Sequence, residues 1–127
     1  MQEQHLFEYA VIRIVPKVER EEFLNIGVIL YCRDQNFLHA KYHLDTAKLK
    51  ALSTELDIAE IEDYLRSICS ISEGTTNSGP IGSLPMADRY RWLTATRSTI
   101  VQCSKTHPGL CKNSEVMLEQ LFQKLVL

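Results

Sequence analysis

The sequence predicts an α+β fold, with a mainly antiparallel sheet of about four strands covered by helices. Two segments near the start, residues 7–15 and 24–32, are rich in β-branched and aromatic residues and are apolar on both faces, which is typical of strands covered on both sides. Later in the chain, apolar residues instead recur at the spacing of amphipathic helices. Helices packed over such a sheet give the α+β class.

The first predicted strand, residues 7–15, ends at Pro16 because proline has no N–H to donate to a sheet ladder. The second, residues 24–32, follows a connection too short for a parallel crossover, so the two strands should pair antiparallel. Gly27 inside the second strand indicates a bulge or a closely packed neighbour. Side chains alternate between the faces of a strand, which places Arg13 on a largely apolar face.

Residues 33–36 are turn formers, and residues 37–43 are the predicted third strand of this hairpin. One face of the third strand is apolar and the other mixes aromatic and basic side chains, which indicates an edge of the sheet. Residues 97–103 are the predicted fourth strand. Residues 105–112 contain a His-Pro-Gly sequence that breaks regular structure, so no strand is expected there.

Two helices should follow the third strand, because each is preceded by an aspartate that can cap it. Asp45 is expected to cap a short helix that runs to about residue 53. Asp57 and Glu60 have the spacing of a capping box at the start of a longer helix. The apolar residues of that longer helix share one stripe, which should lie on the sheet.

The second half of the chain is expected to contain a loop and two further helical segments. Residues 72–85 are rich in glycine and turn formers and should form a loop, as a lid or as an ordinary surface excursion. Residues 86–93 should form a short helical segment. A terminal helix is expected to begin at a cap formed by Asn113 or Ser114.

Length and composition favour one compact domain, residues 1–127. The formal net charge of -2 and the isoelectric point of about 6.1 give no basic excess, which disfavours nucleic-acid binding. The first residues lack a cationic segment followed by an apolar run, and no apolar run approaches the roughly twenty residues that cross a bilayer. A cytoplasmic protein without a membrane partner is therefore expected.

The chemistry of the cysteines gives no clear metal or catalytic motif. Cys103, His107 and Cys111 are ligand types that zinc accepts, but their spacing matches no common zinc motif. Reduced and mostly buried thiols are expected instead. The sequence also lacks a Gly-x-Ser-x-Gly elbow, a phosphate loop and a dinucleotide-binding fingerprint. No metal, cofactor or catalytic residue is predicted.

A cluster of charged and polar residues is the candidate binding site. The Arg13 guanidinium needs a partner, because a desolvated and unpaired cation costs several kcal/mol. Glu22 and Asn25 lie at the opening of the adjacent strand, and the arginines around Trp92 add donors suited to carboxylate or phosphate. The candidate set is Arg13, Glu22, Asn25, Arg91, Arg97 and Ser98. An internal network that fixes the strand connection and a site for an anionic ligand both fit this set.

These residues belong to a pattern that spans most of the chain. It consists of Arg13-x-x-Pro16, Arg20-x-Glu22-Phe-x-Asn25-x-Gly27-Val28, Arg91-Trp92-Leu93 and Arg97-Ser98. The pattern resembles that of a bacterial family known as domain of unknown function 3037. The resemblance implies a small bacterial cytoplasmic protein encoded beside a protein similar to the HipA-type kinases of toxin-antitoxin systems, and hence a HipA-like kinase as partner.

Two functions follow as hypotheses. The first is a non-enzymatic accessory module that binds a partner protein through the predicted edge strand, residues 37–43. The alternative is a small enzyme or ligand-binding protein that recognises a phosphate or carboxylate at the cluster, with arginines as the clamp and Glu22 as an acid or base. The sequence leaves the oligomeric state open, a homo-oligomer included.

Overall fold

The computed structural model describes residues 3–17, 20–95 and 99–127. Within these ranges five strands form one antiparallel sheet: β1 (His5–Ile14), β2 (Leu24–Cys32), β3 (Phe37–Tyr42), β4 (Val101–Cys103) and β5 (His107–Cys111). β2 lies between β1 and β3, and β4 and β5 both pair with the other side of β1. The predicted α+β fold with a mainly antiparallel sheet is confirmed, with one strand more than expected.

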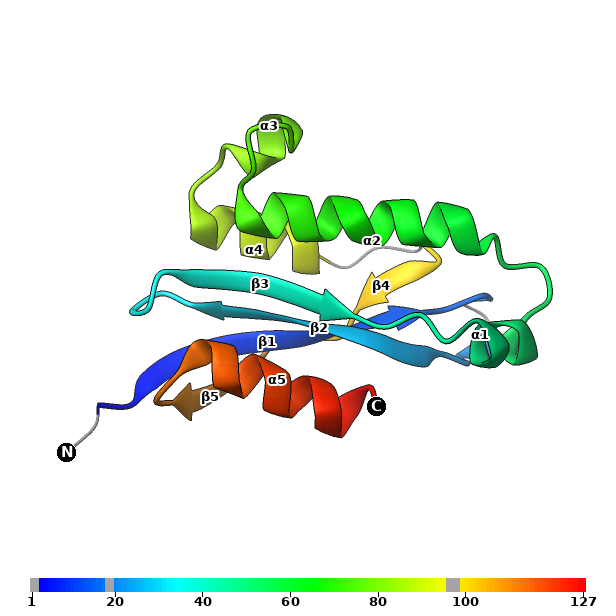
Figure 1. Ribbon diagram of the computed structural model, residues 1–127, viewed down its shortest axis with the longest axis horizontal. Helices are drawn as coiled ribbons and strands as arrows, with labels where there is room; N and C mark the ends of the chain where they lie inside the picture. The colour runs from blue at the N-terminus through cyan, green and yellow to red at the C-terminus, as the bar shows by residue number, and fades with distance from the viewer. Residues whose placement is uncertain (1–2, 18–19, 96–98) are drawn as a thin grey trace.

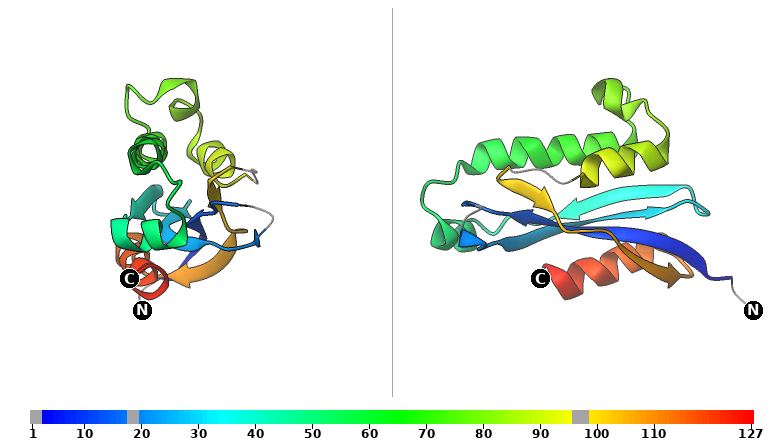
Figure 2. Two further views of the ribbon diagram at one scale, coloured as in Figure 1. Left: turned by 90° about the vertical axis from the view of Figure 1, so that its right-hand side faces the viewer. Right: turned by 180° about the vertical axis from the view of Figure 1, so that it is seen from behind.

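Helices cover both faces of the sheet (Figure 1). α2 (Ile58–Glu73) and α4 (Met86–Thr94) lie over one face, and α5 (Ser114–Leu125) lies over the other. Two shorter helices, α1 (Thr46–Leu52) and α3 (Gly79–Gly82), lie near the two ends of α2. The end view in Figure 2 shows the sheet between the two helical layers.

β1 is buried on both faces, as its sequence predicts. Ala10, Ile12 and Ile14 belong to the hydrophobic cluster under α2, whereas Phe7 belongs to the cluster under α5. β2 contributes to the same two clusters. The middle of the sheet therefore forms two cores, one on each side, which explains why these two strands carry so few polar residues.

Gly27 serves both of the purposes that the sequence suggests for it. The β1–β2 register shifts between Ile12 and Arg13, with Gly27 opposite Ile12 and Asn25 opposite Arg13, so Ile26 is the extra residue of a bulge. A Cβ on Gly27 would also lie 2.7 Å from the carbonyl oxygen of Lys41 on β3. The missing side chain therefore lets β3 pack closely.

β3 forms one edge of the sheet, which confirms the prediction, while β4 and β5 share the other edge (Figure 2). Ser104, between β4 and β5, keeps the ladder along β1 continuous. Its backbone N–H donates to Val11 O, and its hydroxyl accepts from the Val11 N–H, both at 2.8 Å. β4 is shorter than the predicted strand, whose residues 97–98 lie outside the described ranges.

The prediction that residues 105–112 contain no strand is wrong, because His107–Cys111 form β5. Pro108 is tolerated because one side of an edge strand has no ladder partner, so its missing N–H can face outward. Gly109 is required, because a Cβ there would lie 2.5 Å from the Phe7 ring. The two residues that break structure locally are thus the ones that fit this edge position.

The predicted helix starts are confirmed. The side chains of Asp45, Asp57 and Asn113 each accept a hydrogen bond from a backbone N–H in the first turn, at 3.1, 3.2 and 3.0 Å. Of the two caps proposed for the terminal helix, Asn113 is the cap, and Ser114 is the first helical residue.

The loop predicted for residues 72–85 is only partly correct. α2 continues to Glu73 and ends at Gly74, which has a φ of 66° and so takes the left-handed conformation common after helices. The short helix α3 interrupts the rest of the segment. Arg89 on α4 ties the segment back, because its Nη1 donates to Leu84 O at 2.8 Å.

Candidate functional site

The structure brings Arg13 and Asn25 of the predicted cluster together. They are opposite each other on β1 and β2, beside the bulge. The Arg13 guanidinium carbon lies 4.3 Å from the centroid of the Phe23 ring, which is a cation–π contact. Asn25 Nδ2 donates to Leu125 O at 3.3 Å, at the end of α5. The pair therefore lies where the sheet meets the last turn of α5.

Each of these two side chains has one buried polar atom without a hydrogen-bond partner, Arg13 Nε and Asn25 Oδ1. The first is a donor and the second is an acceptor, so the two orphaned atoms are complementary. A bond between the two atoms would satisfy both, and so would a bound polar group. The two atoms therefore fit either an internal hydrogen bond or a hydrogen bond to a ligand.

The other members of the predicted set lie apart from this pair. Glu22 forms an ion pair with Arg20 at 2.7 Å on the exposed surface. Arg91 is exposed on α4, and its guanidinium lies 3.7 Å from Asp88. Within the described ranges, no hydrogen bond or ion pair connects Glu22 or Arg91 to the first pair. Arg97 and Ser98 lie outside the described residues.

A second candidate site is a groove between β3 and α5, with a volume of about 680 Å³. Phe37 and His39 line its β3 side, and their ring centroids are 4.7 Å apart. Val116 lines its α5 side and is 53% exposed. Lys41 on β3 and Glu119 on α5 form an ion pair across it. The groove is thus lined by both apolar and polar side chains, Asn113 and Glu115 among the latter, and one ion pair crosses it.

The outer side of the β3 backbone has no strand beside it in the described chain, although Ala40 O there accepts a hydrogen bond from the Cys69 thiol at 3.7 Å. His43 N–H donates to Ile26 O at 2.8 Å, and bonded pairs alternate in an antiparallel ladder. Every second residue of β3 therefore directs its N–H and C=O away from β2. These outward residues are Leu38, Ala40 and Tyr42. Since β3 pairs with β2 alone among the described strands, the outward groups have no strand partner.

The groups that border this edge have shifted pKa values. The Cys69 thiol on α2 donates to a β3 carbonyl at 3.7 Å, and burial together with the charge of Glu73 raises its pKa to about 11. On the other side, hydrogen bonds from Gln123 and Lys41 lower the pKa of Glu119. At neutral pH the edge therefore lies between an uncharged thiol and an ionised carboxylate.

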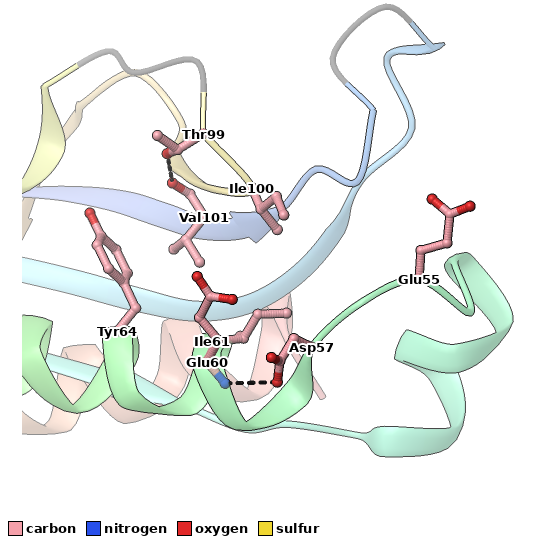
Figure 3. A pocket seen from close by; sticks show the side chains of 8 residues that line it. All are labelled: Glu55, Asp57, Glu60, Ile61, Tyr64, Thr99, Ile100 and Val101. Carbon is pink, nitrogen blue, oxygen red and sulfur yellow. Dashed lines mark hydrogen bonds between the residues drawn. The ribbon is translucent and has the colours of Figure 1, made fainter.

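A third candidate site is a pocket of about 350 Å³ between the start of α2 and residues 99–101 (Figure 3). Ile61 and Tyr64 project from α2 toward the facing segment, where Val101 lies opposite them. The Glu60 carboxylate is directed to the same side of α2. The remaining lining residues are Glu55, Asp57, Thr99 and Ile100.

The three residues considered for zinc have separate neighbours. Cys103 Sγ donates to Leu93 O at 3.6 Å, the Cys111 Sγ lies 3.9 Å from Ser114 Oγ, and the His107 ring packs against Tyr9. In the described part of the chain, no group of three or more His, Cys, Asp or Glu side chains is placed to hold a metal ion. Among the described helices, none combines the length and apolar character that a membrane span requires.

Sequence reasoning missed both the groove and the pocket. The groove forms because residues 37–41 face residues 113–119, and no local sequence pattern predicts a contact between segments so distant in the chain. For the pocket one signal was available. Tyr64 is a large aromatic residue just beside the apolar stripe of α2. It widens the apolar surface of the helix beyond the part that packs on the sheet, which indicates a second contact surface.

Comparison with protein families gives a match that spans nearly all of the structure. The family described as "Protein of unknown function (DUF3037)" matches residues 9–126, from within β1 to the end of α5. Neither the comparison with curated proteins nor the comparison with solved structures gave a match. The matched range includes all three candidate sites. The chain therefore belongs to the DUF3037 family, as its sequence pattern indicated.

Proposed function

We propose that this protein is a non-enzymatic protein-binding module that receives an extended segment of a partner along the outer side of β3. One observation carries the proposal: the outward N–H groups of Ala40 and Tyr42 and the outward C=O of Tyr42, on partly exposed residues, have no strand partner in the described chain, while Leu38 is buried and Ala40 O accepts from the Cys69 thiol. A strand added at this edge would satisfy them through main-chain hydrogen bonds.

The surroundings of β3 support such an addition. Edge strands that must stay unpaired commonly carry a proline, a bulge or an outward lysine. β3 contains no proline, and its register with β2 has no shift. Its single lysine, Lys41, is held by Glu119 on α5. The groove beside α5 would then receive alternate side chains of the partner strand and provide specificity.

The first partner to test is a HipA-like kinase. This choice rests on the family resemblance, which implies that such a kinase is encoded beside the family's members. Other partners would also fit the edge, because main-chain hydrogen bonds require an extended segment but no particular sequence.

Co-purification with the kinase, with and without a blocked edge, tests the proposal. The edge variant is Ala40→Pro. The N–H of residue 40 points away from β2, so proline removes a donor to the partner without removing a bond inside the sheet. Circular dichroism and thermal unfolding show whether the variant folds.

The matched control is Leu110→Pro on β5. Val11 bonds to Ser104, and β1 residues of the same parity as Val11 bond to β5, so Leu110 N–H points away from the sheet at the opposite edge. We expect the wild type and Leu110→Pro to elute with the kinase, and Ala40→Pro to elute alone.

Other outcomes would change the proposal. If Ala40→Pro folds and still elutes with the kinase, the β3 edge is not the binding surface. If the wild-type protein and the kinase separate at micromolar concentrations, the kinase is not the partner. If the protein alone is a dimer that Ala40→Pro converts to a monomer, the edge belongs to a second copy of this chain.

A second function, recognition of a phosphate or carboxylate, is favoured by the orphaned polar atoms of Arg13 and Asn25. An anion beside Arg13 would satisfy its buried Nε donor. Thermal-shift measurements with nucleotides, phosphorylated metabolites and simple carboxylates test it, with Arg13→Met as the variant. A stabilising ligand that no longer stabilises Arg13→Met supports this function. If no compound raises the melting temperature and Arg13→Met only lowers it, the pair is structural.

A further inference from the structure

The pocket at the start of α2 is separate from the β3 edge, because it lies beside β4, at the opposite edge of the sheet. Ile61 and Val101 form its buried floor. Tyr64 is 38% exposed and Ile100 is 45% exposed, so an aromatic ring and a branched aliphatic side chain line a hollow that no part of the described chain fills. Apolar surface gathered in a hollow is typical of a binding surface.

The acidic side chains of α2 differ according to whether they face this pocket. On the outward side, Glu62 and Asp63 both pair with Arg66, at 3.3 and 3.6 Å. On the pocket side, Asp57 and Glu60 form no ion pair in the described chain. In the first two turns of α2, the acidic side chains that face the cavity are therefore the ones that have no cationic partner among the described residues.

Helix capping explains only part of this arrangement. Asp57 caps α2, because its Oδ1 accepts from the Glu60 N–H at 3.2 Å. Among the described residues the Glu60 carboxylate has no such bond, and Figure 3 shows it on the side of α2 that faces residues 99–101, between Asp57 and Tyr64. Capping also gives no reason for the exposed Tyr64 and Ile100 on the two walls. The pocket therefore combines apolar walls with carboxylates that form no ion pair within the described part of the chain.

We infer that this pocket binds the side chain of an arginine that a partner protein presents. The aliphatic stem of the arginine would lie against Ile61 and Ile100, and its guanidinium would stack on Tyr64 and donate to Glu60. Arginine fits better than lysine because a planar guanidinium stacks and donates in fixed directions at once. The volume of about 350 Å³ has room for one arginine side chain and is at the small end of the range for ligand pockets.

A titration of the ¹⁵N-labelled protein with N-acetyl-arginine amide, followed by NMR, tests the inference. N-acetyl-norleucine amide provides a matched stem without charge, and N-acetyl-lysine amide provides a different cation. The pocket variant is Glu60→Gln, because glutamine is also favoured at this position of a capping box and so preserves the helix start. The control is Glu62→Gln, which removes a carboxylate from the same helix outside the pocket.

We expect the arginine probe to shift the amide signals of Ile61, Tyr64 and Val101 saturably, with affinity that falls as salt is added. Glu60→Gln should weaken binding about fivefold or more, and Glu62→Gln should leave it unchanged. The inference is wrong if the arginine probe gives no saturable shift, if the norleucine or lysine probe binds as tightly, or if the two variants behave alike.

Discussion

Arg13 and Asn25 are opposite each other on β1 and β2, and each has one buried polar atom outside any hydrogen bond. A buried polar group without a partner costs about 1–3 kcal/mol, and a pair of complementary orphans carries that cost twice. The bulge at Ile26 creates this arrangement, because it brings Asn25 rather than an apolar residue opposite Arg13. A hydrogen bond at this pair, whether internal or to a ligand, would therefore stabilise the folded state.

A double-mutant cycle measures whether the two side chains interact. Arg13→Met and Asn25→Leu should each lower the free energy of unfolding by about 1 kcal/mol, because the first removes the cation–π contact with Phe23 and the second removes the hydrogen bond to Leu125 O. If Arg13 and Asn25 bond to each other in solution, the double variant should cost about 1 kcal/mol less than the sum of the two single variants. Urea denaturation gives the four values. Additive effects would show that the two side chains do not bond to each other in solution. The control is Arg91→Met on the exposed surface of α4, which should change the free energy of unfolding by less than about 0.5 kcal/mol.

Gly27→Ala should destabilise the fold by about 2–3 kcal/mol, because the added Cβ meets backbone that cannot turn aside. The Lys41 carbonyl oxygen would be 2.7 Å away and the Tyr42 Cβ 3.1 Å away. Gly79→Ala is the comparison, since its Cβ meets nothing but its φ of 80° costs about 1 kcal/mol for a non-glycine residue. Urea denaturation should therefore rank Gly27→Ala as clearly worse. An equal effect would mean that β3 moves away easily.

Alkaline pH should weaken the fold through Tyr90. Burial raises the pKa of this hydroxyl, which also bonds to Thr106 Oγ1 at 3.1 Å. Because the folded-state pKa lies above that of an unfolded tyrosine, near about 10, the stabilisation is complete below that pH and is lost as pH rises above it. The free energy of unfolding, measured by urea denaturation between about pH 8 and 11, should fall more steeply for the wild type than for Tyr90→Phe. Parallel curves would contradict this assignment.

The Cys69 thiol should react slowly with iodoacetamide at neutral pH. Its pKa of about 11 leaves little of the nucleophilic thiolate, because burial and the nearby Glu73 disfavour the negative charge. Mass spectrometry of the alkylated peptides should show modification of Cys69 that accelerates as pH approaches 11, and much faster modification in urea. Glu73→Gln should increase the rate in the folded protein. Rapid modification at neutral pH would show that α2 separates readily from the β3 edge.

The parts of the fold that depend on local chemistry were predictable from the sequence. β2 has the predicted bounds, and the caps Asp45 and Asp57 act as expected, because a strand pattern and a capping side chain are both read within a few residues. β5 was not predictable, since Pro108 and Gly109 break structure locally and only pairing with β1 makes them suitable. Long-range pairing overrode the local signal there.

The same distinction applies to the candidate sites. Arg13 and Asn25 were predictable neighbours because they belong to one hairpin with a short connection. Arg91 had no such constraint, and its position on α4 depends on how that helix packs. The groove beside β3 and the pocket beside β4 each join segments that are distant in sequence, so their existence required the three-dimensional arrangement.

The continuous ladder on the far side of β1 has a consequence for synthesis. Val11 and Ser104 bond to each other although 93 positions separate them. While the ribosome is still making the middle of the chain, β1 has β2 beside it, but its other flank and the surface later covered by α5 stay open to water. Such nascent chains are prone to aggregate. Premature termination anywhere before β4 should therefore yield insoluble fragments rather than a smaller working unit.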